Sequence, residues 1–145
     1  MTRDAPDASF TPDVALLCCQ QCLADPGVTS GLLDVEGCRA RLVVLPCSSK
    51  LEGSHLLKIL ANGTDGIQVV GCPEGSCRFG VGSRMALKRV ERARGFLEQI
   101  DLGAERLAMD RTAGLARQDL VSLAASRAEA VRSLGASPMK GDEKT

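Results

Sequence analysis

The sequence predicts an α/β fold, in which a short parallel sheet of about four strands is flanked by helices in a flavodoxin-like or Rossmann-like arrangement. Short apolar runs bounded by Gly, Pro and Asn alternate with longer segments in which apolar residues recur every three or four positions. Strands that alternate with helices favour a parallel sheet covered on both faces. The chain has 145 residues, of which 44% are hydrophobic and 25% charged, as expected for one globular domain.

Four short apolar segments are predicted to be strands: residues 14–19, 41–46, 66–71 and 104–109. The second of these carries β-branched residues at its centre and ends at Pro46, which cannot donate to a sheet ladder. Between the first two strands, Pro26 and Gly31 would break a long helix, so residues 25–37 are expected to form a short helix and a loop.

Three segments with apolar residues at helical spacing are predicted to be helices: residues 53–62, 84–100 and 113–134. Ser54 and Ser83 are placed to cap the first two helices, because a hydroxyl can accept a hydrogen bond from a free backbone N–H group at a helix start. A glycine-rich turn over residues 71–82 joins the third strand to the second helix.

The polar ends of the chain predict flexible tails at residues 1–11 and 136–145 around a single domain of residues 12–135. The first residues contain no apolar run, and no stretch approaches the roughly 18 apolar residues of a membrane helix. We therefore expect no targeting peptide and no membrane insertion. The expected location is the cytoplasm, where disulfides are rare and clustered cysteines usually bind metal or take part in catalysis.

The charge balance and the aromatic content argue against nucleic-acid binding. The 18 basic and 18 acidic residues cancel to a formal net charge of zero. The chain has no Tyr or Trp and only three Phe on which bases could stack. Domains that bind nucleic acids usually carry a basic surface and often use aromatic stacking, so no nucleic-acid partner is expected.

Seven cysteines stand out in this composition, and five of them are expected to meet at one edge of the sheet. Three predicted strands have a cysteine at or directly after their carboxyl end: Cys19, Cys47 and Cys72. Cys22 and Cys77 follow in the loops after the first and third of these strands. The carboxyl ends of parallel strands form the crevice where open α/β sheets bind ligands, so these five thiols are candidate metal ligands.

Thiolates bind zinc or iron–sulfur clusters, and four ligands complete either site. Gly71 and Gly75 would let backbone N–H groups approach a cluster closely and donate to its sulfides, and Gly80 and Gly82 could do the same. The residues alone leave three interpretations open, which are an iron–sulfur cluster, a zinc site and a set of unrelated structural thiols.

Three cysteine-containing stretches follow one another in the sequence: CCQQC at residues 18–22, LVVLPCSSKLEG at 42–53 and ANGTDGIQVVGCPEGSCRFGVGSRMALKRV at 61–90. They place a C-x2-C after the first strand, a Pro-Cys-Ser at the end of the second and a GC-x4-C around the third. In this order and spacing they resemble the hydrogenase iron–sulfur subunit family, whose best-known member is the delta subunit of methyl-viologen-reducing hydrogenase. The resemblance covers about residues 12–130.

The resemblance implies a [2Fe–2S] cluster and an electron-transfer role without catalytic activity of its own. Family members pass electrons between a hydrogenase or formate dehydrogenase and a flavin-containing, heterodisulfide-reductase-like subunit. The implied partners are such subunits and other iron–sulfur or ferredoxin-type modules of a large oxidoreductase complex, with electron bifurcation as one context. Carried over by position, the implied ligands are Cys19, Cys22, Cys47, Cys72 and Cys77.

A cluster with thiolate ligands takes four, so one of the five implied ligands would lie near the cluster or stay free. Cys18 and Cys38 fall outside the family pattern and are expected to be structural. The sequence also departs from that pattern around the third strand. Pro73, Ser76 and the pair Arg78-Phe79 stand where members usually carry His, Asp and His-Tyr.

These departures spare the thiols but change the surroundings of a cluster, so the potential and the partner are expected to differ from those of typical members. The class II benzoyl-coenzyme A reductase complex is similar in containing a subunit of this kind beside bifurcating flavin and tungsten subunits. It therefore offers a second context for the same relay function.

Two other spacings suggest different chemistry. Cys72 and Arg78 have the C-x5-R spacing of cysteine phosphatases and arsenate reductases, in which backbone N–H groups and the Arg bind an oxyanion while the thiolate attacks. Phe79, however, stands where those enzymes carry Ser or Thr. Cys19 and Cys22 have the C-x2-C spacing of dithiol redox motifs, which belong at the N-terminus of a helix.

The predicted helix at residues 84–100 is basic, with five Arg or Lys residues interrupted by Glu91. A solvated helix face is the ordinary explanation, and a docking surface for an acidic partner, using Arg89 and Arg92, is the alternative. His55 is the only histidine. It lies at the start of a predicted helix, away from the strand ends, so it is expected at the surface rather than on a metal.

Overall fold

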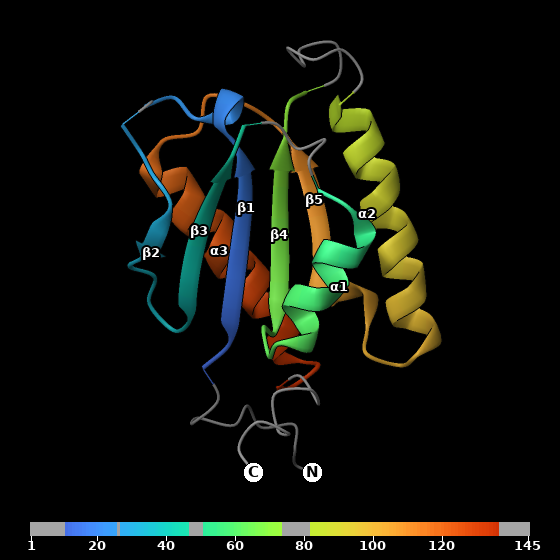
Figure 1. Cartoon of the computed structure of the whole chain (residues 1–145). Coiled ribbons are helices and arrows are strands. Elements are labelled where there is room, and N and C mark those ends of the chain that lie inside the picture. The colour runs from blue at the N-terminus through green and yellow to red at the C-terminus, as the bar shows by residue number, and fades with distance from the viewer. Residues whose placement is uncertain (1–10, 26, 47–50, 74–81, 137–145) are drawn as a thin grey trace.

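The computed structural model describes residues 11–25, 27–46, 51–73 and 82–136, which form a sheet with helices on both faces (Figure 1). Five strands lie in the order β2-β3-β1-β4-β5. Their bounds are β1 Asp13–Cys19, β2 Gly31–Leu33, β3 Arg39–Leu45, β4 Gly66–Gly71 and β5 Leu107–Arg111. The predicted α/β fold with a mostly parallel sheet is confirmed, with five strands rather than about four.

β1 lies at the centre of the sheet because it pairs in parallel with both β3 and β4. β4 pairs in parallel with β5 on its other side. The chain therefore leaves β1 toward β3 on one side and continues to β4 on the other side. In open α/β sheets this reversal of direction marks the place where ligands bind, at the carboxyl ends of the strands.

The prediction of a short helix within residues 25–37 is wrong, because β2 lies there and pairs antiparallel with β3. Leu32 lies opposite Arg41 in this pairing. The Val44 N–H group donates a 2.8 Å hydrogen bond to Ser30 Oγ and fastens the segment further. Helix-breaking residues showed that no long helix could form here, but the partner strand that stabilises β2 lies elsewhere in the sequence.

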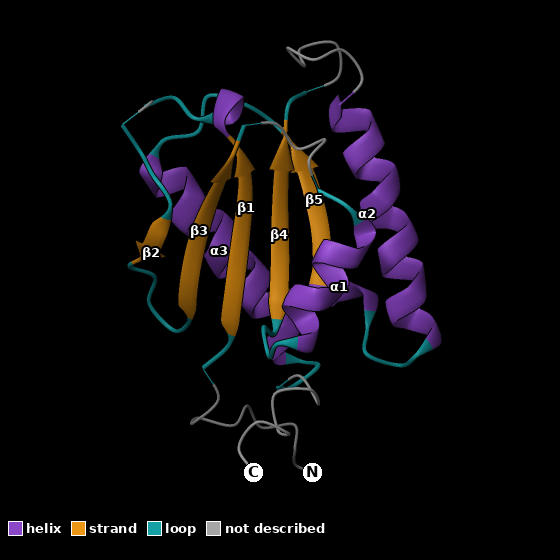
Figure 2. Ribbon diagram, viewed as in Figure 1, coloured by secondary structure: helices purple, strands orange, loops and turns teal. Residues whose placement is uncertain are grey.

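Three helices flank the sheet: α1 Gly53–Ala61, α2 Gly82–Gln99 and α3 Arg117–Arg132. α1 and α2 cover one face and α3 covers the other (Figure 2). The predicted caps are wrong, although α1 begins at residue 53 as expected and only α2 begins earlier. Glu52 precedes α1, and α2 already starts at Gly82, so neither Ser54 nor Ser83 stands at an N-cap.

Two predicted boundaries shift near the end of the domain. Residues 104–106 form a short 3-10 helix, and the strand that follows is β5. α3 begins at Arg117 rather than at residue 113, because Gly114 has φ +73°, which an α-helix does not allow. The Ala116 N–H group donates to Asp119 Oδ2 at 2.9 Å and so satisfies one free donor at the helix start.

Side chains of the central strands alternate between two cores. Leu16 and Leu42 face α3, where Leu120 and other α3 residues cover them. Leu17 and Ile67 face the side of α1 and α2. Every residue of β4 is buried, as expected for a strand with a covered face on either side. Among the described residues, no helix is both long and apolar enough to cross a membrane.

Arg106 ties the end of α3 to the sheet. Its side chain is almost fully buried and donates hydrogen bonds to four backbone carbonyls, those of Leu102, Asp65, Leu134 and Gly135, at 2.8 to 3.4 Å. Burial lowers the pKa of Arg106, and the nearby Asp65 opposes that effect. The residue therefore joins three separate stretches of chain at the edge of the sheet opposite the carboxyl ends of the strands.

Candidate metal centre

The carboxyl ends of β1 and β4 bring two predicted ligands together. Cys19 is the last residue of β1, and Cys72 follows the last residue of β4. In the register of these two strands Cys18 lies opposite Val70, so Cys19 is level with Gly71, the residue before Cys72, at the same edge. Parallel pairing alone therefore places Cys19 and Cys72 close to each other.

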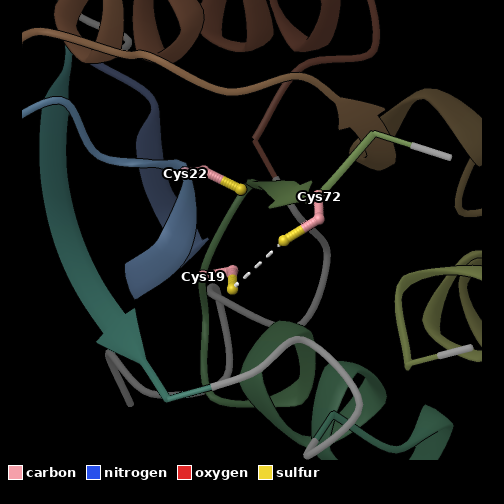
Figure 3. Close-up of side chains that lie close together, drawn as sticks. All are labelled: Cys19, Cys22 and Cys72. Carbon is pink, nitrogen blue, oxygen red and sulfur yellow. Dashed lines mark hydrogen bonds between the residues drawn. The ribbon is translucent and has the colours of Figure 1, made fainter. Parts of the chain in front are cut away.

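Cys19, Cys22 and Cys72 form a buried group that we call the thiol triad. Their three Sγ atoms lie within 4.8 Å of one another, and Cys19 Sγ is 3.9 Å from Cys72 Sγ (Figure 3). Cys22 and Cys72 point their sulfur atoms toward the same space from two separate chain segments (Figure 3). All three side chains are at most 3% exposed, so the triad lies inside the protein rather than on its surface.

A turn and a distant segment hold Cys22 in this position. Residues 20–22 form a short 3-10 turn directly after β1. The Leu115 N–H group donates to the Cys22 carbonyl at 2.9 Å, and the Ala24 N–H group donates to the Leu115 carbonyl at 2.8 Å. The loop that carries Cys22 is thus fixed to the connection between β5 and α3.

The same connection also contacts the end of β4. The Thr112 N–H group donates to the Gly71 carbonyl at 3.0 Å, one residue before Cys72. We call residues 112–116 the strap segment, because their backbone bonds fasten both cysteine loops. The strap segment could not be predicted from the sequence, since backbone hydrogen bonds leave no signature in residue type.

Burial and neighbouring thiols raise the pKa values of two cysteines at this edge, Cys22 and Cys18. The pKa of Cys22 is raised by its hydrogen bond with Cys19, by burial and by the other thiols of the triad. Cys18 has a pKa raised to about 12, first by burial and then by Cys19 and Cys72. Additional negative charge is therefore disfavoured in this pocket unless a cation accompanies it.

These donors fit a thiolate-bound metal. A tetrahedral ion with bonds of about 2.3 Å to sulfur separates its ligands by about 3.8 Å, close to the spacing of Cys19 and Cys72. Sulfur ligands favour zinc or iron–sulfur centres over hard cations. Three thiols are one short of the four that complete either centre.

The structure brings together three of the five predicted ligands, and the other two, Cys47 and Cys77, lie outside the described residues. Cys19 Sγ lies 4.0 Å from the carbonyl oxygen of Pro46, the residue before Cys47 in the chain. Of the predicted glycines, Gly71 ends β4 beside the triad, while Gly75 and Gly80 are outside the described part.

The two cysteines outside the family pattern occupy different places. Cys38 is buried just before β3, at the opposite edge of the sheet from the triad. Cys18 is buried beside the triad, and its Sγ lies 3.4 Å from the Cys19 carbonyl, to which it donates. Cys18 points into the core on the α3 side.

The alternative chemistries find less support in the described geometry. Cys19 precedes a three-residue 3-10 turn rather than an α-helix, so it lacks the helix N-terminus that activates a dithiol motif. Cys72 is 3% exposed and lies among thiols, and Arg78 of the C-x5-R spacing is outside the described residues. His55 is exposed on α1, as predicted.

Comparison with known proteins identifies the family. The sequence profile of the methyl-viologen-reducing hydrogenase delta subunit matches residues 14–135, which is most of the chain. The chain belongs to this family. The matched range runs from β1 through α3 and contains the whole thiol triad.

Relatives within the delta-subunit family are distant in sequence but similar in length. The chain is 27% identical over 130 residues to the vhu iron-sulfur subunit of the F420-non-reducing hydrogenase of Methanocaldococcus jannaschii, covering 89% of this chain and 97% of that protein. It is 26% identical over 106 residues to the iron-sulfur subunit of the F420-non-reducing hydrogenase of Archaeoglobus profundus, covering 72% and 77%. A third relative, the corresponding vhu protein of Methanopyrus kandleri, is 31% identical over 67 residues, covering 46% and 51%.

Proposed function

We propose that this protein is an iron–sulfur electron-transfer subunit whose thiol triad binds a [2Fe–2S] cluster. The observation that carries the proposal is the meeting of three buried Sγ atoms within 4.8 Å at the carboxyl edge of the sheet. The relatives in the delta-subunit family are named iron-sulfur subunits, which supports iron over zinc. Cys47 or Cys77 would supply the fourth thiolate.

A bound cluster would supply one centre that accepts and releases single electrons. The chain supplies everything around that centre. Cys19, Cys22 and Cys72 would give up their protons to the solvent as they bind iron. Burial keeps water from the sulfur atoms, and the strap segment holds the two cysteine loops at a fixed spacing, so that little rearrangement is needed when the charge changes.

We extend the proposal to the context of the relay. The relatives are iron-sulfur subunits of F420-non-reducing hydrogenases by name. We infer from this that the present chain transfers electrons within a complex rather than converting a substrate. We propose a cytoplasmic complex in which this chain connects a hydrogenase-like, formate dehydrogenase-like or ferredoxin-type module to a flavin-containing, heterodisulfide-reductase-like subunit. An electron-bifurcating assembly similar to class II benzoyl-coenzyme A reductase is one form of it.

The proposal is tested by metal analysis of the full chain purified without oxygen. We expect about two irons and two sulfides per chain, together with a visible spectrum that bleaches on reduction. Cys72→Ala should lose most of the iron, whereas the matched variant Cys38→Ala, at the far edge of the sheet, should keep it. Stoichiometric zinc without iron would replace the proposal with a structural zinc site, which three sulfurs this close would also fit.

A second assay separates the relay from the phosphatase-like alternative. The purified protein should not hydrolyse a phosphate ester or reduce arsenate. Activity of either kind that Cys72→Ser abolishes would contradict the electron-transfer proposal and favour nucleophilic catalysis by Cys72.

A further inference from the structure

α2 presents an outer side whose residues are exposed along the length of the helix. Its inner residues, among them Ala86, Val90 and Leu97, are buried against the sheet. In Figure 1 the helix runs along one side of the molecule, with its outer side turned away from all labelled elements. An ordinary solvated face would carry polar residues there.

Large apolar side chains lie on that outer side among the polar ones. Met85 is 40% exposed, Phe96 44% and Ile100 43%. Met85 and Phe96 are three helical turns apart and therefore lie on the same side of α2. Among the described residues, Phe96 is the single Phe, and there is no Tyr or Trp. Exposed aromatic and Met side chains are enriched where proteins bind one another.

The basic residues of α2 divide into two groups. Arg89 donates to the Leu51 carbonyl at 2.9 Å and Arg94 to the Ala104 carbonyl at 3.2 Å, so both hold α2 to its own domain. Arg84, Lys88 and Arg92 are exposed, and no described acidic side chain forms an ion pair with any of them. The prediction that Arg89 belongs to a docking surface is therefore not supported.

Gly95 is a second unusual feature of the outer side. It lies in the middle of α2, where Gly destabilises a helix by up to about 1 kcal/mol relative to Ala. A Cβ atom at this position would meet nothing within 4 Å, so packing inside the domain does not require Gly. A missing side chain next to Phe96 would allow another backbone to approach the helix closely.

We propose that the outer stripe of α2, consisting of Met85, Lys88, Arg92, Gly95 and Phe96, is a docking surface for an acidic protein surface with an apolar recess for Phe96. The two cations of the stripe give charge complementarity, while its apolar residues give contact area. The inference holds whether or not the thiol triad binds a cluster.

The arrangement favours a protein partner over a lipid surface or a second copy. Anionic membranes attract clusters of about four to eight basic residues, whereas this stripe has two, with one further cation, Arg84, and the acidic Glu91 beside it. Two copies meeting through α2 would bring Lys88 and Arg92 of each against the same cations of the other. α2 starts ten residues after Cys72, so a partner along the stripe would also reach toward the triad edge of the sheet.

The test uses the tagged full chain, produced in its own cells with a photo-crosslinking amino acid at position 96. The control chain carries the same amino acid at Leu32, an exposed apolar residue of β2 on the far side of the sheet. We expect position 96, but not position 32, to crosslink to a segment of another protein that is rich in Asp and Glu. Crosslinks from position 96 to lipid, to a second copy of this chain or to nothing would overturn the proposal.

Charge reversal supplies an independent measurement on the crosslinked partner. Arg92→Glu should weaken binding of that partner about tenfold, and added salt should reduce the difference between variant and wild type. The matched variant Arg117→Glu reverses an exposed charge on α3 and should bind as wild type does. Both side chains are exposed, so neither change should unfold the domain. Circular dichroism spectra of the two variants, compared with that of wild type, are the check on folding. Equal binding by Arg92→Glu and wild type would refute the role of the stripe.

Discussion

Gly114 sits in the strap segment with φ +73°, between the hydrogen bonds that fasten the two cysteine loops. We predict that Gly114→Ala destabilises the domain by about 1 to 2 kcal/mol, which is the energy of placing a residue with a Cβ in the left-handed region. A Cβ at this position would meet nothing within 4 Å, so a steric clash adds nothing to that figure. The predicted loss therefore comes from backbone conformation alone.

The control is Gly95→Ala, which also places a methyl group in open space but within a regular helix. This variant should stabilise the free protein by about 0.5 to 1 kcal/mol. Urea unfolding of both variants and wild type, followed by circular dichroism, measures the two changes with opposite signs. Gly114→Asn should lie between Gly114→Ala and wild type, because Asn tolerates the left-handed region. Equal free energies of unfolding for Gly114→Ala and wild type would refute the reasoning.

Three further substitutions test the packing of the domain. Arg106→Ala should lower the free energy of unfolding by about 3 kcal/mol, because it leaves buried carbonyls without donors; a loss below about 1 kcal/mol in urea unfolding would show that water replaces the guanidinium. Gly66→Ala should lower the melting temperature, since its Cβ would come within 3.0 Å of Val131 Cγ1, and overpacking of this kind removes about 1 to 3 kcal/mol; an unchanged melting temperature would contradict that contact. Leu120→Ala should lower the free energy of unfolding by about 3 kcal/mol through a cavity under α3, whereas the exposed Leu32→Ala should change it by less than about 0.5 kcal/mol; similar losses in both would contradict the described core.

The central part of the fold could be predicted from sequence because its signals are local. The apolar runs at residues 14–19 and 66–71 correspond to β1 and β4, which are buried from both sides and therefore need no polar alternation. β2 could not be predicted, since its three residues become a strand only by pairing with β3. α3 begins later than predicted because Gly114 has a left-handed backbone conformation, which the hydrogen bonds of the strap segment hold in place. The spacing of apolar residues does not reveal this conformation.

The candidate site was predictable to the extent that topology determines it. Cysteines at the ends of strands meet when the strands are parallel and adjacent, which holds for Cys19 and Cys72. Cys22 joins them through the turn after β1 and through bonds to Leu115. Those hydrogen bonds join backbone groups, so no pattern of residue types predicts them. The sequence likewise could not predict which cations of α2 hold the helix to its domain and which are exposed, because this depends on which backbone carbonyls they reach.

The hydrogen bond between Leu115 and Cys22 joins the turn after β1, the first strand, to the connection between β5 and α3 near the end of the domain. Synthesis proceeds from the N-terminus, so Cys19 and Cys22 leave the ribosome long before the strap segment does. A growing chain that ends before residue 112 holds the same thiols without the bonds that set their spacing. The triad therefore reaches its final spacing only after residues 112–116 have been synthesised. A metal bound to all three thiols would indicate that the domain has folded completely.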